Sequence, residues 1–174
     1  PKTALLIIDM QLGNFQGQDS IRYGNRLLEK CKILIDKARV AIIPIVFIKN
    51  RGSKGDPDEP DTEGWEIHPE LAPRITDQIV EKTTPDSFHK TSLKRELDSI
   101  DVSRLVIAGL QTEYCIDTTC RCASLLGYDV ILASDAHSTW DSDLLSAESI
   151  INHHNNVLAG TFVSLCKTDE ITFR

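Results

Sequence analysis

The sequence predicts an α/β protein with a three-layer α/β/α architecture around a doubly wound, mostly parallel sheet. Continuously apolar segments of strand length alternate with segments whose apolar residues recur at helical spacing. Such runs are typical of parallel strands that are buried on both faces, with helices covering the two sides. A length of 174 residues, 41% of them hydrophobic, suits one domain that spans residues 1–174.

The expected elements follow one another in strand and helix order. Residues 4–8 form the first apolar run, and residues 27–38 repeat apolar side chains at helical spacing. A second strand is expected over residues 42–48, and Ile79 with Val80 forms a shorter third stretch. The later expected elements are a helix over 93–100, a strand over 105–108, a helix over 116–126, a strand over 130–133 and a helix over 143–154.

The longest segment without apolar periodicity covers residues 50–66 and includes the acidic stretch GDPDEPDTEG. A solvated surface loop is the usual interpretation of such a composition. Loops of this length in compact domains are also often lids over functional sites, and Trp65, Ile67 and His68 could then cover a pocket. Both interpretations stay open.

Charge and apolar content exclude several classes of partner. The formal net charge of −7 repels nucleic acid and anionic lipid. No apolar run approaches the roughly 20 residues that span a bilayer, and the first residues lack the charged and cleavable apolar regions of a signal peptide. We expect a cytoplasmic protein whose partner is a small-molecule substrate.

The five cysteines are odd in number and lack the paired spacing of a zinc site or a disulfide scaffold. Most of them are expected to be buried, reduced thiols. Cys115 differs, because it follows an apolar strand and stands where a helix should begin. The positive end of the helix dipole would lower the pKa of its thiol and make it a nucleophile.

Two further polar residues follow strand-like segments. Asp9 comes directly after residues 4–8, and Lys82 comes after the third apolar stretch. Because parallel strands end at one edge of a sheet, the acid, the ammonium and the thiol of Cys115 could meet there as a triad. The third strand would lie further out, so Lys82 would have to reach in along its stem or from the following loop. Taken singly, each residue has a structural explanation.

Four segments resemble signature segments of the isochorismatase-like cysteine hydrolases: IIDMQ with Asp9, VEKTTPDSF with Lys82, AGLQTEYCIDTTC with Cys115, and SDAHSTWDS. They occur in the family's order and cover residues 5–154. The resemblance implies the six-stranded, Rossmann-like fold of that family, with the first strand beside the strand that ends at Ala108.

The resemblance also implies a reaction, the hydrolysis of a carbon–nitrogen bond in an amide, a lactam or a related group. Asp9 would act as general base towards Cys115, whose thiolate forms an acyl-enzyme, and Lys82 would hold Asp9. By resemblance, the oxyanion donors are the backbone amides of Gln111 and Cys115. The peptide bond between Leu110 and Gln111 is expected to be cis.

The branch of the family is indicated by what the motifs contain. The nicotinamidase branch binds a metal through an aspartate and a histidine after the second strand; residues 47–51, FIKNR, have neither, so no metal and no cofactor is expected. Glu113 stands where many relatives have aspartate. GLQTEYC with HSTWDS resembles a subgroup that includes streptothricin hydrolases, which open a lactam. Candidates for the substrate pocket are Gln11, Phe15, Trp65, Phe88, Tyr114 and Trp140.

Two alternatives of other kinds stay open. True isochorismatases cleave a vinyl ether and typically lack the nucleophilic cysteine, so Cys115 would be dispensable in that reaction. A redox-sensing or non-catalytic protein could instead oxidise Cys115 and resolve it with another thiol. Cys120 and Cys122 favour core positions on the following helix, and His137 suits either the site or a structural role. Related proteins assemble, so a homo-oligomer, dimer or tetramer, is expected.

Overall fold

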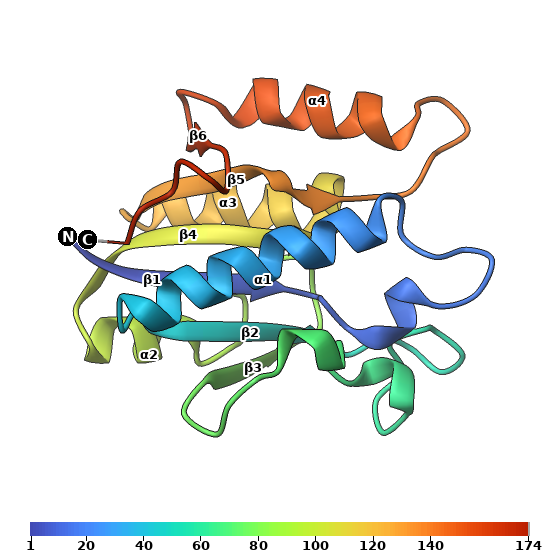
Figure 1. Cartoon of the computed structure of the whole chain (residues 1–174), viewed down its shortest axis with the longest axis horizontal. Coiled ribbons are helices and arrows are strands. Elements are labelled where there is room, and N and C mark those ends of the chain that lie inside the picture. The colour runs from blue at the N-terminus through green and yellow to red at the C-terminus, as the bar shows by residue number, and fades with distance from the viewer. Residues whose placement is uncertain (174) are drawn as a thin grey trace.

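The computed structural model describes residues 1–173, which build one sheet of six strands (Figure 1). The strand order is β3-β2-β1-β4-β5-β6, and every neighbouring pair is parallel. The predicted α/β class with a doubly wound sheet is therefore confirmed. The strands are β1 (Lys2–Ile8), β2 (Ile45–Asn50), β3 (Gln78–Lys82), β4 (Val102–Leu110), β5 (Asp129–Ser138) and β6 (Ser164–Cys166).

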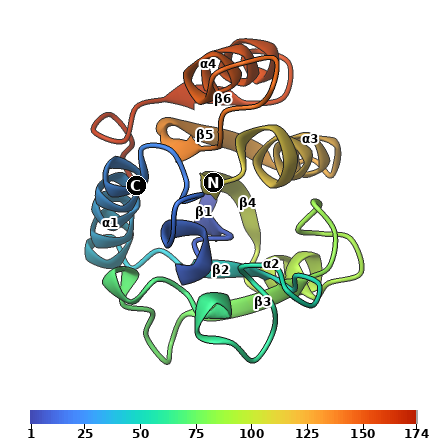
Figure 2. The same ribbon diagram turned by 90° about the vertical axis from the view of Figure 1, so that its right-hand side faces the viewer.

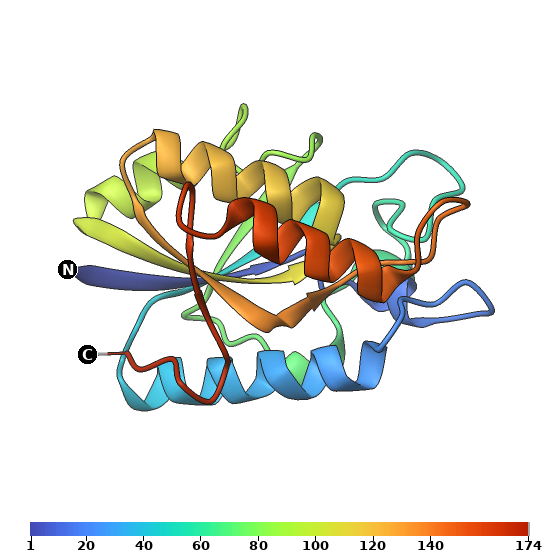
Figure 3. The ribbon, with the colours of Figure 1, turned by 90° about the horizontal axis from the view of Figure 1, so that it is seen from above.

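Helices cover both faces of the sheet. The long helix α1 (Gly24–Val40) lies on one face, and α2 (Leu93–Ser99), α3 (Asp117–Leu125) and α4 (Ala147–Leu158) lie on the other (Figure 3). No helix within residues 1–173 has the length and apolar character that a membrane span needs. Single helical turns complete the chain: η1 (Leu12–Phe15), η2 (Glu63–Trp65), η3 (Pro69–Leu71) and the π-turn η4 (Thr112–Ile116).

The sheet divides the core into two apolar clusters. Along β1, Leu5 and Ile7 point to the α1 side, whereas Leu6 and Ile8 point to the side of α2 and α3. All four side chains are fully buried. The continuously apolar sequence of β1 follows from this double burial, because both faces of a central parallel strand are covered.

Several boundaries differ from the sequence-based expectation. β5 continues to Ser138, beyond the expected end at residue 133, after a register shift opposite Ile107 and Gly109 of β4. The irregular pairing interrupts the apolar pattern, so the sequence does not indicate this second half of the strand. α4 begins at Ala147, where the Ser146 side chain caps the helix by accepting from the amide of Ser149. The helix expected over residues 143–154 was therefore wrong at both ends, because α4 starts after this cap and continues to Leu158. β6 was not predicted, since its three residues carry no readable period.

The strand order reverses at β1, which has β2 on one side and β4 on the other. Ile8 pairs with Ile48 and with Gly109, so β1 and β4 are neighbours as expected. A Cβ at Gly109, whose φ is +126°, would lie 2.1 Å from the carbonyl oxygen of Ile8. Only glycine allows this close approach. The strands end together on the side that faces the viewer in Figure 2, where a doubly wound fold forms its ligand crevice.

Candidate active site

Three polar residues converge where β1 and β3 end and η4 begins. Lys82 Nζ donates to Asp9 Oδ2 at 3.0 Å and to Cys115 Sγ at 3.2 Å. The side chains of Lys82 and Asp9 are 0% and 6% exposed. Since β2 lies between β3 and β1, the lysine reaches past it along its own stem. Of the two routes expected for Lys82, the structure therefore shows the one along its own side chain from the outer strand β3.

Asp9 leaves β1 in an unusual backbone conformation. Its φ of 54° lies in the left-handed region, which aspartate and asparagine tolerate better than most residues. The carbonyl of Asp9 accepts from Asn14 Nδ2 at 3.1 Å, and its amide donates to Ile48 O at 2.9 Å. The second carboxylate oxygen, Oδ1, is buried without a hydrogen-bond partner in the described chain. That oxygen is available to accept a proton.

The pKa values of the pair reflect burial first. Burial raises the pKa of the Asp9 carboxyl, although the Lys82 ammonium acts in the opposite direction. Burial also acts to lower the pKa of Lys82, but the neighbouring Asp9 and Cys115 outweigh it and the pKa is raised. Lys82 therefore remains a cation, and Asp9 is a stronger proton acceptor than an exposed carboxylate.

Cys115 lies within the π-turn η4, which begins directly after Gln111, and the peptide bond between Leu110 and Gln111 is cis, as expected. Burial, together with the nearby Asp9 carboxylate, raises the pKa of the Cys115 thiol to about 12. The expectation that a helix dipole lowers this pKa was wrong. α3 begins only at Asp117, and desolvation with a neighbouring anion outweighs the dipole. The resting thiol is protonated.

Asn50, at the end of β2, belongs to the same cluster and was not singled out from the sequence. Its Oδ1 accepts from Lys82 Nζ at 3.1 Å. The Gln11 side chain holds the Asn50 backbone, accepting from its amide at 2.8 Å and donating to its carbonyl at 2.9 Å. Gln11 Nε2 also donates to the carbonyl of Trp65. The predicted substrate contact of Gln11 is not supported, because all its amide groups bind the protein itself.

The segment of residues 50–66 is packed against η1. A Cβ at Gly13 would lie 2.0 Å from the carbonyl oxygen of Pro57, and a Cβ at Gly64 would lie 2.2 Å from the same atom. Such distances leave no room for any side chain other than hydrogen. The segment is a closely fitted wall beside the site in this structure.

The predicted aromatic pocket residues are spread over several places. Phe15 packs edge-on against His68, with ring centroids 5.0 Å apart. Trp65 donates from Nε1 to Asn50 O, so it lies next to the site. Phe88 stacks on Tyr128 at 5.8 Å and packs against the core, so the structure does not bring it to the site.

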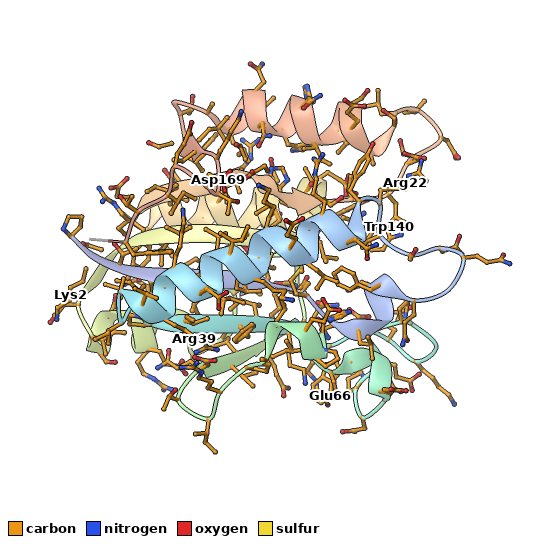
Figure 4. All side chains as sticks on the ribbon, in the orientation of Figure 1. Lys2, Arg22, Arg39, Glu66, Trp140 and Asp169 are labelled. Carbon is orange, nitrogen blue, oxygen red and sulfur yellow. The ribbon has the colours of Figure 1, made fainter. Side chains whose placement is uncertain are left out.

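Tyr114 and Trp140 lie near the carboxyl ends of the strands. Tyr114 is 54% exposed, one residue before Cys115. Trp140 donates from Nε1 to the carbonyl of Asp19 and borders a polar cavity of about 520 Å³, which Arg22 also lines. Figure 4 shows Trp140 and Arg22 together at that end of the molecule. Their contact with a substrate stays a prediction.

His137 has a structural role. Its Nε2 lies 2.8 Å from Asn155 Oδ1, and its Nδ1 lies 2.8 Å from the hydroxyl of Thr112 in η4. Asn155 Nδ2 donates to Ser134 O, so Oδ1 must accept from His137 Nε2, and Nδ1 accepts from Thr112. Burial lowers the pKa of His137 to about 4. The histidine is neutral and ties α4 to the turn that carries Cys115.

The remaining thiols lie apart from the site. Cys120 is fully buried in the core, as the helical spacing predicts. The predicted core position of Cys122 was wrong, because this thiol is only partly buried and donates to Asp86 Oδ2 at 3.2 Å. His154 Nδ1 donates to Asp117 Oδ2 at 2.9 Å. All five cysteines are free thiols, as expected, but only Cys31 and Cys120 are fully buried, so the expectation that most of them are buried was wrong.

The residues at the carboxyl end of β2 do not fit a divalent metal ion. Lys49 Nζ lies 3.5 Å from the centroid of the Trp65 ring, and the guanidinium of Arg51 lies 5.5 Å from the same ring. Two cations therefore flank the position where metal ligands would be needed. Within residues 1–173 no three His, Cys, Asp or Glu side chains are placed to hold a metal ion together.

Comparisons with known sequences identify a family model and curated relatives that match this chain. The family model of the isochorismatase domain matches residues 3–161. A streptothricin hydrolase of Streptomyces noursei is 36% identical over 138 residues, which cover 79% of this chain and 50% of that protein. Nicotinamidase 3 of Arabidopsis thaliana is 30% identical over 158 residues, 83% of this chain and 77% of that protein. The chain spans about half the length of the streptothricin hydrolases that it matches.

Solved structures show the same architecture. The crystal structure of an isochorismatase family protein superposes with a TM-score of 0.90 at 32% identity, covering 95% of this chain and 98% of that one. An isochorismatase from Pseudomonas putida KT2440 superposes with a TM-score of 0.93 at 25% identity, covering 98% and 90%. The sheet order and the helical layers are therefore shared with solved proteins.

Proposed function

Since the chain belongs to the isochorismatase family of hydrolases, we propose that it hydrolyses a carbon–nitrogen bond of a small amide or lactam through a thioester on Cys115. The observation that carries this proposal is the contact of one buried ammonium, Lys82, with both the carboxylate of Asp9 and the thiol of Cys115. Acyl transfer needs a nucleophile next to a group that can accept its proton, and here the Lys82 ammonium holds the thiol of Cys115 and the carboxylate of Asp9 side by side.

The first half-reaction forms the acyl-enzyme. Asp9 accepts the thiol proton while the sulfur of Cys115 bonds to the carbonyl carbon, and the carbonyl π electrons move to oxygen. We assign the stabilisation of that oxyanion to the backbone amides of Gln111 and Cys115. When the carbonyl re-forms, the carbon–nitrogen bond breaks, and the leaving nitrogen takes the proton from Asp9.

The second half-reaction consumes one water. Asp9 accepts a proton from the water as its oxygen bonds to the thioester carbon, and the carbon–sulfur bond then breaks. The departing sulfur of Cys115 recovers the proton from Asp9, and the acid product leaves. Lys82 keeps its charge throughout, offsetting whichever neighbour is anionic.

The raised pKa values suit this sequence of proton transfers. Burial raises the pKa of Asp9, which brings it closer to the pKa of about 12 for the Cys115 thiol. Proton transfer between the two groups is easier when their pKa values approach one another. A thiol that stays protonated at rest is also protected from oxidation, which disfavours the redox-sensing alternative.

The substrate class rests on relatives and on local chemistry. Streptothricin hydrolase and nicotinamidase, the names of two relatives, support an amide or lactam substrate. The cations Lys49 and Arg51 at the carboxyl end of β2 support a reaction without a metal. Assembly into a homo-oligomer stays a prediction, which light scattering coupled to size-exclusion chromatography would test.

A panel of small amides and lactams, assayed with the wild type and with Cys115→Ala, tests the proposal. We expect release of ammonia or amine by the wild type, a trapped thioester detected by mass at Cys115, and loss of both in the variant. Cys122→Ala is the matched control, because that thiol contacts Asp86 outside the site.

Other outcomes would point elsewhere. Turnover of vinyl ethers that survives Cys115→Ala would indicate the isochorismatase-type reaction. A wild type that turns over none of the substrates, yet forms a reversible disulfide at Cys115 under peroxide, would indicate redox sensing.

A further inference from the structure

The Lys82 ammonium has three N–H groups, and each meets one acceptor. The acceptors are Asp9 Oδ2 at 3.0 Å, Asn50 Oδ1 at 3.1 Å and Cys115 Sγ at 3.2 Å. Two of these acceptors have roles in the proposed reaction. The third, Asn50, has none, and it is the neutral group that completes the set.

The orientation of the Asn50 amide is fixed from its other end. Its Nδ2 donates to Asp58 Oδ2 at 2.7 Å, so its Oδ1 must face Lys82. The segment leaves space for this carboxylate, because a Cβ at Gly52 would lie 2.0 Å from Asp58 Oδ1. Asp58 has no basic partner in the described chain, so Asn50 is its side-chain contact.

The backbone of Asn50 is held as firmly as its side chain. Gln11 bonds to both its amide and its carbonyl, and Trp65 Nε1 donates to the same carbonyl at 3.0 Å. Gln11 lies two residues after Asp9, on the segment that follows β1. The groups that hold the Asn50 backbone therefore come from two segments, Gln11 after β1 and Trp65 in η2.

We infer that Asn50 is a positioning residue, which holds the Lys82 ammonium at a point shared by Asp9 and Cys115, and that Asp58 orients Asn50 for this task. Without a third acceptor, one N–H would lack a partner, and the ammonium would be free to move. The wall of residues 50–66 would then act on the reaction through one hydrogen-bonded chain, Asp58 to Asn50 to Lys82. Only the catalytic consequence rests on the proposed function.

The ammonium itself reports whether this inference holds. In protein labelled with ¹⁵N-lysine, the exchange rate of the Lys82 Nζ protons with water is measured by NMR without any substrate. Asn50→Ala should speed this exchange by about tenfold or more, because a hydrogen bond from a charged donor is lost. Asp56→Ala is the matched control, since that carboxylate lies in the same segment and accepts from Ser53 N away from the site.

Exchanging the two side chains separates positioning from simple packing. Asn50→Asp alone replaces the hydrogen bond to Asp58 by repulsion between two carboxylates, which turns the new side chain away from Lys82 and should also speed exchange. The double variant Asn50→Asp with Asp58→Asn keeps the net charge and restores one acceptor towards Lys82 and one hydrogen bond between the two positions. We expect its exchange rate to return to within about threefold of the wild type.

Clear outcomes would overturn the inference. One is a change of less than twofold in the exchange rate of the Lys82 Nζ protons in Asn50→Ala. The other is an exchange rate in the double variant that is no lower than the rate in Asn50→Asp. If Asn50→Ala does not fold, Asp58→Ala gives the same test from outside the core. Because no substrate is present, failure of amide hydrolysis and failure of this inference are distinguishable. On a substrate found by the panel, kcat should fall about tenfold in Asn50→Ala, with KM within twofold.

Discussion

Asp9 and Lys82 form a buried ion pair although they lie 73 positions apart in the sequence. Their charged atoms are 3.0 Å apart, and a whole strand, β2, separates the strands from which they come. Each charge is stabilised mainly by the other, because both side chains are buried.

Lys82→Met should reduce the free energy of unfolding by about 3–5 kcal/mol at neutral pH, because it leaves a buried carboxylate without its cation. Amide hydrolysis should be lost as well. Urea denaturation followed by circular dichroism measures the first effect, and the substrate panel measures the second.

The pH dependence of this variant gives an internal check. Without the ammonium, the folded-state pKa of Asp9, already raised by burial, rises further above its value of 3.8 in the unfolded chain. The folded variant then binds more protons than the unfolded one, so its stability increases as the pH falls towards 4. Adding Asp9→Asn, a residue suited to the left-handed φ of 54°, should recover part of the loss. A deficit that does not vary with pH would contradict this account.

His137 should make the protein acid-sensitive. Its pKa is about 4 in the folded protein against 6.5 as the ordinary value, because burial disfavours the charged ring. Between these values the unfolded chain binds the proton first, so the free energy of unfolding falls as the pH decreases from 6.5 to 4. The loss over this window should be about 3 kcal/mol.

The measurement compares denaturation curves of the wild type and of His137→Gln across that pH range. The difference between the two isolates the histidine from other groups, including Asp9, whose raised pKa acts in the opposite direction. If the free energy of unfolding has the same pH dependence in both proteins, His137 is not the source of the acid sensitivity.

Gly13→Ala should release the wall of residues 50–66. The new Cβ would lie 2.0 Å from the carbonyl oxygen of Pro57, so the segment must move, at a cost of about 1–3 kcal/mol. Faster limited proteolysis within residues 50–66 measures the release. In the control Gly17→Ala a Cβ meets nothing within 4 Å, although its φ of +77° adds some strain. Equal protease resistance in both variants would show that the contact does not hold the wall.

The fold could be predicted because its signals are local. The doubly buried strand β1 has no polar residue between Ala4 and Ile8, and Asp9 follows this run directly. Cys115 lies five residues after Leu110, the last residue of the buried strand β4. Parallel strands end at one edge, so the meeting of these groups follows from the alternating pattern.

Other properties of the site depend on tertiary packing, which no local sequence pattern indicates. The thiol pKa of Cys115 is set by burial and by Asp9, which the position of the residue at the start of a helix does not reveal. Asn50 looks like the first residue of a polar loop, and Gln11 looks free to bind a substrate. Their roles appear only once β2 is placed between β1 and β3.

The placement of β3 at the margin of the sheet has a consequence for how the protein fails. This strand is bonded to a single neighbour, β2, and it ends in Lys82. Marginal strands detach at a smaller free-energy cost than central ones. At low urea concentrations, turnover should therefore be lost while the helical circular dichroism signal is still that of the folded protein. Local detachment of β3 would inactivate the protein reversibly, because Lys82 returns to the site when the strand pairs again.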